Sequence, residues 1–274
     1  MIYFRNLDDY FHLQRLVAQG GQFGVIGGGF IGSELAAILA TKDQPVTMVF
    51  SEESIGARLF PADLSRFITE YYRQHNVELL AGEMVIGIEH DGSEKVIQTR
   101  SNKAIRVDHV IAGLGIKPDV SLAEAAGIQV ANGIVVDRYL RTNQPDITAA
   151  GDVAYFHNPI LDKWERVEHE DNALSMGKTA GRNMAGDQAS YDHLPMFYSD
   201  LFDLGYEAIG ELDPNLETWA DWQEPYRKGV VYYLDQGRVR GVLLWNVWDQ
   251  VEAARNLIAD RGPIKAEDLK GRIT

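Results

Sequence analysis

The chain has 274 residues, of which 45% are hydrophobic and 24% charged, and its formal net charge is −14. This length leaves room for one large or two to three small domains. The acidic balance argues against nucleic-acid binding, because binding a phosphate backbone needs a basic surface. The sequence contains no cysteine. Disulfides, thiolate metal sites and thiol redox centres are therefore excluded within it, and we expect no metal site.

No apolar run approaches the ~20 residues that are needed to cross a bilayer. The N-terminal residues lack the basic and apolar regions of a secretory signal. We therefore expect no membrane association. We expect a cytoplasmic protein, with a mitochondrial one as the alternative.

Short β-branched runs alternate with helical patterns, which predicts an α/β fold with a largely parallel sheet. In the helix of residues 31–41, the spacing places Ile31, Leu35, Ile38 and Leu39 on one apolar stripe. The patterns of the first half predict, in chain order, a helix at 8–18, a strand at 23–26, a helix at 31–41, a strand at 46–50, a helix opened by Pro61 and a β-meander at 77–110.

The remainder begins strand-rich and ends with antiparallel strands. Between these two parts we expect an Ala- and Gly-containing helix at 171–185. The expected strands and C-terminal helices are strands at 134–136, 147–150, 206–212, 230–234 and 239–245, and helices near 248–260 and 265–272. Changes in pattern place domain boundaries near residues 112 and 195.

A glycine-rich turn, Gly27-Gly28-Gly29-Phe30-Ile31-Gly32, joins the strand at 23–26 to the following helix. In a G-x-G-x-x-G motif the first glycine permits a tight turn, the second admits a pyrophosphate, and the third allows close helix–strand packing. The helix N-terminus then attracts the phosphates. The spacing and context predict a dinucleotide site, and the alternative is a glycine turn that binds nothing.

Glu52 lies at the end of the next strand, twenty residues after Gly32. A carboxylate there accepts hydrogen bonds from a ribose 2′-hydroxyl and repels a 2′-phosphate, so it favours NAD(H) over NADP(H). The adjacent Glu53 is the alternative for this role. Arg58 follows in a glycine-containing loop, where it is either a contact of the adenosine part or a surface arginine.

Phe30 and Glu34 follow the second glycine of the motif. Phe30 is either a ring that stacks near the nicotinamide or ordinary packing. We expect Glu34 in the first helical turn, where the helix dipole stabilises a carboxylate whatever its function. The residues alone leave both alternatives open.

The chain resembles the flavoprotein reductases typified by apoptosis-inducing factor and the ferredoxin and rubredoxin reductases. The resemblance covers essentially the whole chain. It rests on the glycine turn and on a set of later motifs: Ala112-Gly113-Leu114-Gly115-Ile116-Lys117-Pro118, Ala149-Ala150-Gly151-Asp152-Val153, Val167-Glu168-His169-Glu170-Asp171, Met196-Phe197-Tyr198-Ser199-Asp200-Leu201, Gly205-Tyr206-Glu207-Ala208-Ile209-Gly210 and Leu243-Leu244-Trp245-Asn246.

This resemblance implies three domains. Residues 1–112 would be a Rossmann-like NAD-binding domain with a preceding linker, 113–195 the second half of an FAD-binding domain, and 196–274 a small C-terminal α+β domain. The first half of the FAD domain, with its own glycine turn, would precede residue 1. We therefore expect a fragment, or a chain without stable flavin binding.

The resemblance also implies the site residues, with no protein acid or base catalysing the hydride step. Phe30, Glu34 and Tyr198 would position the two cofactor rings. Tyr198 stands where apoptosis-inducing factor has tryptophan, which gives it a smaller stacking face. The implied NAD contacts are Gly27, Gly28, Gly29, Phe30, Ile31, Gly32, Glu34, Glu52, Arg58, Gly115, Glu168, Glu207 and Asn246, and the implied FAD contacts are Arg5, Asp152, His169, Glu170 and Tyr198.

By this resemblance the protein is an NADH-dependent flavin oxidoreductase that transfers hydride from NADH to FAD, with an unknown electron acceptor. FAD is expected only with the preceding half present. The alternative is a flavin-free module that binds NAD(H) or docks a partner without turnover. A nucleotide-dependent homodimer is a further expectation, and a disulfide reductase is the less favoured relative.

Overall fold

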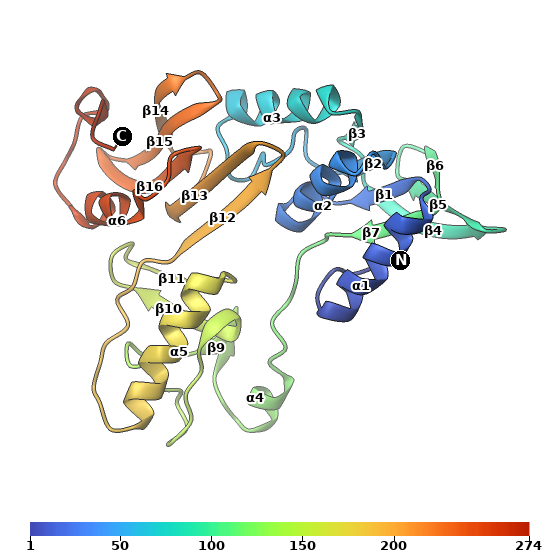
Figure 1. Ribbon diagram of the computed structural model, residues 1–274. Helices are drawn as coiled ribbons and strands as arrows, with labels where there is room; N and C mark the ends of the chain where they lie inside the picture. Colours follow the sequence, from blue (N-terminus) through green and yellow to red (C-terminus); the bar gives the residue numbers. More distant parts are fainter. Residues whose placement is uncertain (274) are drawn as a thin grey trace. The chain divides into compact units, whose positions relative to one another are not determined.

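The computed structural model describes residues 1–273 and forms two compact units (Figure 1). The first unit comprises Met1–Gly115 together with Ser199–Gly205. The second comprises Ile116–Tyr198 and the chain from Tyr206 to the C-terminal end. Among the described residues, none of the helices is both long and apolar enough to cross a membrane.

The first unit is built on a four-stranded parallel sheet in the order β3-β2-β1-β7. Every residue of β1 and β2 is buried, as expected for strands covered on both faces of a parallel sheet. The strands are β1 (Phe23–Ile26), β2 (Val46–Phe50), β3 (Val77–Ala81) and β7 (His109–Ala112), and the helices are α1 (Leu7–Gln19), α2 (Phe30–Thr41) and α3 (Ala62–Gln74). The predicted α/β fold and its first elements are confirmed.

The predicted β-meander at 77–110 is wrong at both ends. Only β4 (Val85–Asp91), β5 (Glu94–Thr99) and β6 (Ala104–Val107) form an antiparallel sheet. The flanking strands β3 and β7 pair in parallel with β2 and β1 instead. The meander packs its apolar residues Ile97 and Val107 with Ile26 of β1. Short strands carry the same local pattern in either arrangement, so the partner strand decides which sheet they join.

The predicted apolar stripe of α2 is also partly wrong. Leu35 and Leu39 are buried, but Ile31 and Ile38 are 41% and 54% exposed. The buried face instead contains small residues, Gly32, Ser33, Ala36 and Ala37. Small side chains let the helix approach the strands more closely than isoleucine would.

The second unit begins with a sheet in the order β11-β10-β9-β8 and the helix α5 (Glu170–Met184). Met176 and Ala180 of α5 pack on Phe156 of β10. The remaining elements are α4 (Ser121–Ala125), β8 (Val130–Ala131), β9 (Gly133–Val135), η1 (Gly151–Val153), β10 (Ala154–Asn158) and β11 (Lys163–Glu165). The predicted strand at 147–150 is wrong, because this segment makes only an isolated bridge between Thr148 and Arg141.

A five-stranded antiparallel sheet, ordered β12-β13-β16-β15-β14, follows. Its strands are β12 (Met196–Leu201), β13 (Leu204–Gly210), β14 (Glu217–Glu224), β15 (Lys228–Asp235) and β16 (Arg238–Trp245). Ala254 and Ile258 of α6 (Val251–Ala259) pack into its core. The prediction missed β12 and β14, and the expected helix at 265–272 is only a 3-10 turn, η2 (Ala266–Leu269). The tip of the β12–β13 hairpin, Ser199–Gly205, belongs to the first unit.

Candidate nucleotide-binding site

The glycine turn closes between β1 and α2 through backbone contacts that leave no room for side chains. Gly27 has φ +106°, and a Cβ added to it would lie 2.3 Å from the carbonyl oxygen of Gly113. A Cβ on Gly32 would lie 2.1 Å from the carbonyl oxygen of Gly27. The first and third glycines of the motif therefore serve the tight turn and the close helix–strand packing that the sequence predicts.

The second glycine of the motif has a different environment. Gly29 is the exposed N-cap of α2, and a Cβ there would meet nothing within 4 Å. The first N–H groups of a helix have no intrahelical acceptor and lie at the positive end of its dipole. The turn thus presents an open backbone surface on which a phosphate fits. Ile31 is exposed and Phe30 half-buried in the first turn.

Glu52 lies two residues after β2, at the carboxyl edge of the parallel sheet. Its carboxylate pairs with the guanidinium of Arg58 and accepts a hydrogen bond from Ser51 Oγ at 3.1 Å. The Glu52 side chain is 23% exposed, whereas that of Arg58 is 81% exposed. Glu52 and Arg58, which the sequence predicts as two separate contacts, are therefore one ion pair.

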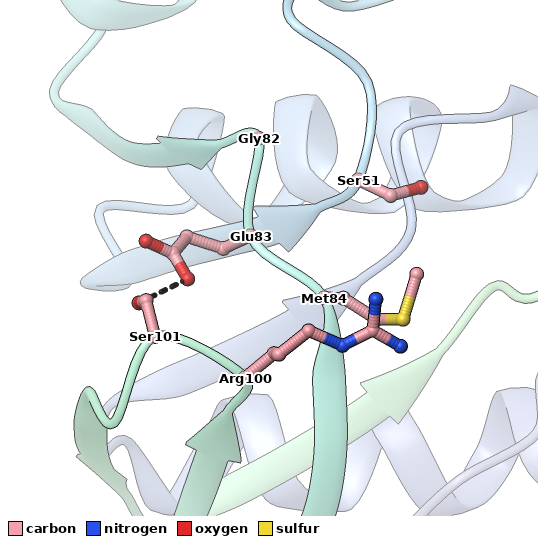
Figure 2. A pocket seen from close by; sticks show the side chains of 6 residues that line it. All are labelled: Ser51, Gly82, Glu83, Met84, Arg100 and Ser101. Carbon is pink, nitrogen blue, oxygen red and sulfur yellow. Dashed lines mark hydrogen bonds between the residues drawn. The ribbon is translucent and has the colours of Figure 1, made fainter.

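A cavity of about 280 Å³ opens beside this strand end (Figure 2). Met84 and Arg100 lie side by side in its wall, and Arg100 N–H donates to the Met84 carbonyl at 2.8 Å. The strand end of Glu52 borders it, since Gly82 N–H donates to the Glu52 carbonyl at 2.9 Å. The cavity is lined by Ser51, Gly82, Glu83, Met84, Arg100 and Ser101.

Glu83 is the buried acid of this cavity. It pairs with Lys103 Nζ at 2.8 Å and accepts from Ser101 Oγ at 2.6 Å. The hydrogen bonds from Lys103 and Ser101 lower the pKa of Glu83 to about 2. Glu83 therefore stays ionised at neutral pH with its charge compensated by a neighbour.

Glu34 lies in α2 and contacts the hairpin tip. Ser199 Oγ donates to Glu34 Oε1 at 2.5 Å. Burial raises the pKa of Glu34, with Asp200 adding to the rise and the Ser199 hydrogen bond opposing it. Glu34 is the fifth residue of a helix that starts at Phe30, so its predicted place in the first turn is wrong. Burial and Ser199 therefore set its environment more than the helix terminus does.

Two further predicted contacts belong to the first unit. Gly115 follows β7 in an exposed loop with φ +82°, a conformation that favours glycine. Arg5 is exposed just before the N-cap Asn6 of α1, and its backbone N–H donates to Asp9 Oδ2 at 3.0 Å.

In the second unit, Asp152 lies in the single turn η1. Arg166 Nη1 donates to the Asp152 carbonyl at 3.0 Å and also contacts the Glu168 carboxylate. Its Nε is buried and makes no hydrogen bond within the described part of the chain. Arg166 thus connects two predicted cofactor contacts, and no sequence pattern singled it out.

His169 is the N-cap of α5, and its ring stacks on Phe197 of β12 with centroids 4.5 Å apart and planes at 14°. Burial lowers the pKa of His169, which favours its neutral form. Glu170 begins the helix and is exposed. Tyr198, next to Phe197 on β12, is 56% exposed.

Glu207 and Asn246 lie on the antiparallel sheet of the second unit. Glu207 Oε2 is buried and, within residues 1–273, accepts no hydrogen bond. Burial raises the pKa of Glu207, and Asp249 adds to the rise. Asn246 has φ +49° directly after β16, and its Nδ2 donates to the Arg227 carbonyl at 2.9 Å. A half-buried acid with an unsatisfied oxygen is a candidate ligand contact.

The predicted residues thus form two groups. The first unit holds the glycine turn, Glu34, Glu52, Arg58, Gly115 and Arg5, and the second unit holds Asp152, Glu168, His169, Glu170, Tyr198, Glu207 and Asn246. Their union in one site stays a prediction. Sequence reasoning missed Ser199, Arg166 and Gly113. Of these, only Gly113 carries a local signal, because it is a glycine directly after a buried strand.

Comparison with known proteins identifies the family of the chain. Residues 2–177 match the family model of pyridine nucleotide-disulphide oxidoreductases. Residues 180–225 and 220–260 match the C-terminal segment of mitochondrion-associated apoptosis-inducing factor. The two matches meet near the end of α5 and together cover nearly all of the described chain.

The chain is 32% identical over 289 residues to apoptosis-inducing factor 1 of Dictyostelium discoideum, covering 97% of this chain and 54% of that protein. It is 29% identical over 266 residues to putidaredoxin reductase of Pseudomonas putida, covering 96% of this chain and 63% of the relative. Its fold matches a ferredoxin reductase of Rhodopseudomonas palustris with a TM-score of 0.90 and 26% identity, covering 97% of this chain and 66% of that one.

The chain therefore spans between 54% and 63% of the length of these two curated relatives. Proteins of this family use NAD(H) and FAD, and the cradle at Gly27–Gly32 fits a pyridine nucleotide. The family match covers more than half of the chain, and the fold agrees with it. The chain belongs to the pyridine nucleotide-disulphide oxidoreductase family.

Proposed function

We propose that this protein binds NADH in its first unit and, as part of an FAD-dependent oxidoreductase, passes reducing equivalents from NADH to a flavin and then to an external acceptor. The glycine cradle carries this proposal, because Gly27 and Gly32 leave no space for a Cβ while Gly29 faces open space. That combination suits a backbone surface that holds a pyrophosphate.

The adenosine end of the nucleotide is assigned to the strand end at Glu52. In open parallel sheets, ligands bind beyond the carboxyl ends of the strands. The cavity beside Glu52 has a volume of about 280 Å³, close to the lower limit of about 300 Å³ for ligand pockets. Met84 offers it an apolar face and Arg100 a cationic one. Glu52 would accept hydrogen bonds from the ribose, and the cavity is the candidate place for the base.

The Glu52 carboxylate also favours the binding of NADH over that of NADPH. Arg58 could neutralise a 2′-phosphate, but Glu52 already occupies its guanidinium. A 2′-phosphate would therefore approach a half-buried carboxylate, and the like charges would repel each other.

The second unit is assigned to the flavin and to the ring end of the nicotinamide. The candidate flavin contacts are Asp152 in η1 and the N-terminus of α5 at His169 and Glu170. The unsatisfied Nε of Arg166 and Oε2 of Glu207 are buried polar atoms that a bound group could satisfy. When both cofactors are bound, they supply hydride transfer from nicotinamide to flavin. The protein binds and aligns them, and its own residues hold no thiol, since the sequence contains no cysteine.

For the electron acceptor we assign only a chemical class. One relative has been solved in a covalent complex with putidaredoxin, and others are named monodehydroascorbate reductases. We infer an acceptor that takes electrons one at a time, either a small redox protein or an organic radical.

The relatives carry mitochondrial and peroxisomal names, and our expectation of a cytoplasmic protein stays a prediction. A nucleotide-dependent homodimer is likewise a prediction.

Calorimetric titration with NADH and NADPH tests the nucleotide assignment. We expect NADH to bind at least about tenfold more tightly, a difference of about 1.4 kcal/mol. Glu52→Arg should shift the preference toward NADPH. Glu53→Arg is the matched control, because Glu53 is the neighbouring exposed acid. Equal affinities for the two nucleotides in the unmodified protein, or a larger shift from the control, would contradict the assignment to Glu52.

The flavin assignment is tested by absorbance of the purified protein and by anaerobic addition of NADH. We expect a flavin spectrum that NADH bleaches. A protein that binds FAD but is never reduced by NADH would exclude the oxidoreductase function.

The second candidate function is a flavin-free NAD(H)-binding or partner-docking module. The glycine cradle supports this candidate as well, because a cradle at a helix N-terminus can hold the phosphates of NAD(H) without a flavin. Tight NADH binding by a colourless protein that added FAD does not alter would support this candidate.

A further inference from the structure

The tip of the β12–β13 hairpin has an unusual backbone. Only Phe202 and Asp203 separate the two strands, and Phe202 has φ +63°. Glycine and asparagine enter this left-handed region easily, but a bulky aromatic residue is strained there. Such strain persists only where the surroundings hold the residue in place. The tip is therefore held by something other than its own turn preference.

Two aromatic residues of α3, Tyr71 and Tyr72, and the C-cap residue His75 hold it. The Phe202 ring stacks on His75 with centroids 4.1 Å apart and planes at 26°. It also packs edge-on against Tyr72 at 4.9 Å and Tyr71 at 5.9 Å. The Tyr71 hydroxyl donates a hydrogen bond to the carboxylate of Asp203, the other loop residue. We refer to Phe202, Tyr71, Tyr72 and His75 as the aromatic anchor.

The aromatic anchor is connected to the N-terminal half of α2 by two routes. Tyr72 is fully buried, and its hydroxyl donates to the Ser33 carbonyl at 2.9 Å. Ser199, three residues before Phe202, is 2% exposed and donates to Glu34 at 2.5 Å. Two neighbouring residues of α2, Ser33 and Glu34, are thus held by the anchor and by the hairpin it fixes.

We propose that Phe202 is a positioning residue of the nucleotide site: by docking on α3 it keeps Ser199 on the Glu34 carboxyl group and so orders the nicotinamide end of the site. This inference rests on the proposed function and on the sequence-based prediction that Glu34 lies at the nicotinamide end of the site. Ser199 donates a hydrogen bond to the Glu34 carboxylate, while burial disfavours the ionised form of Glu34. Loss of the anchor releases Ser199 and leaves a partly buried carboxyl group without its donor.

The aromatic anchor should therefore act on one end of the ligand only. The phosphate cradle at Gly27–Gly32 adjoins Ser33, whose carbonyl accepts a hydrogen bond from Tyr72, and Phe202→Gly keeps Tyr72. We therefore expect the cradle and the strand end at Glu52 to stay in place when Phe202 is removed. Tyr198, the other predicted ring contact, is joined to Ser199 by a peptide bond, so movement of Ser199 also moves Tyr198. Removing Phe202 from the aromatic anchor should weaken the binding of NADH. It should not weaken the binding of ADP-ribose, which lacks the nicotinamide.

The test compares NADH and ADP-ribose binding by calorimetry in the unmodified chain and in Phe202→Gly. Glycine relieves the backbone strain, so the hairpin turn itself is kept. We expect about fivefold weaker NADH binding, the loss of roughly one hydrogen bond, and unchanged ADP-ribose binding. The matched control is Gln236→Gly in the β15–β16 turn, where φ is +50° and the side chain is a glutamine. The control should leave both ligands unchanged.

Two more variants connect Phe202 with Ser199. Ser199→Ala should weaken NADH binding by the same factor. The double variant should bind NADH no more weakly than either single variant, because both substitutions remove the same interaction. Tyr71→Phe removes only the hydroxyl that contacts Asp203, and it should give a smaller loss of about twofold. If Phe202→Gly does not fold, Tyr71→Phe serves for the same comparison of NADH binding with ADP-ribose binding.

Equal losses for NADH and ADP-ribose would overturn the inference, since they would show a merely structural role. Unchanged NADH binding in Phe202→Gly, or additive losses in the double variant, would overturn it as well. Failure of the unmodified chain to bind either ligand would instead overturn the proposed function, and the inference with it. The two failures are therefore distinguishable.

Discussion

The glycine turn of the first unit and the acidic group around Glu207 in the second unit are two different kinds of candidate binding surface. The turn is made by six consecutive residues, and its surface is backbone. The surface around Glu207 is made by side chains from β13 and from the loop after β16, where Asp249 acts on the Glu207 carboxyl group. A backbone surface demands glycine at set spacings, whereas a side-chain surface demands only that distant residues meet.

Glu34 and Glu207 extend this comparison to single residues. Burial raises the pKa of both carboxyl groups. Glu34 accepts a hydrogen bond from Ser199, while Glu207 Oε2 accepts none within the described residues. An unsatisfied buried oxygen costs more than a satisfied one, so Glu207 is the better candidate for a group that a ligand completes.

The largest effect is expected in the glycine turn, where two substitutions should distinguish a loss of stability from a loss of NADH binding. Gly32→Ala places a Cβ 2.1 Å from the Gly27 carbonyl, so we expect a loss of about 1–3 kcal/mol in the free energy of unfolding, together with loss of NADH binding. Gly29→Ala meets no protein atom within 4 Å, so it should weaken NADH while leaving the unfolding midpoint unchanged. Thermal denaturation and calorimetry measure the two quantities. NADH binding at full strength by Gly29→Ala would break the assignment of this surface to a phosphate.

A smaller effect is expected from Glu207→Gln. A group whose pKa is raised in the folded state contributes stability at low pH that is lost as the pH rises through the folded pKa. Removing the acid should therefore stabilise the protein at about pH 8 relative to the unmodified chain, and less at about pH 5. NADH binding should weaken at the same time. Denaturant unfolding at both pH values checks this, and a variant that is less stable at the higher pH would contradict an unsatisfied carboxylate.

The smallest effect is expected at Glu83, whose shift has the opposite sign. Its pKa is lowered to about 2, so its contribution to stability is present above the ordinary glutamate pKa and is lost as the pH falls toward that value. Glu83→Gln should lower the unfolding midpoint slightly at neutral pH and not at about pH 2. An acid titration of both proteins measures the difference. Equal slopes below about pH 4 would show that Lys103 and Ser101 do not stabilise the carboxylate.

Much of the first unit could be predicted from sequence, because its elements have strong local signals. The helix N-cap at Gly29, the buried run of β2 and Glu52 at its end all appear in order along the chain. The predictions that proved wrong concern segments whose sequence pattern is compatible with two different structures. The strands β3 and β7 have local sequences that suit either a meander or a parallel sheet, and only their pairing with β2 and β1 decides between them.

The sequence by itself determined the α/β class, the glycine cradle and the candidate carboxylate of the ribose, because each depends on residues that are close in the chain. The tertiary structure alone decided that Arg58 is paired with Glu52. It likewise decided that Ser199 donates to Glu34 across 165 positions and that Phe202 docks on α3. Contacts between distant positions depend on how elements pack, and packing is a property of volume and geometry that no local pattern carries.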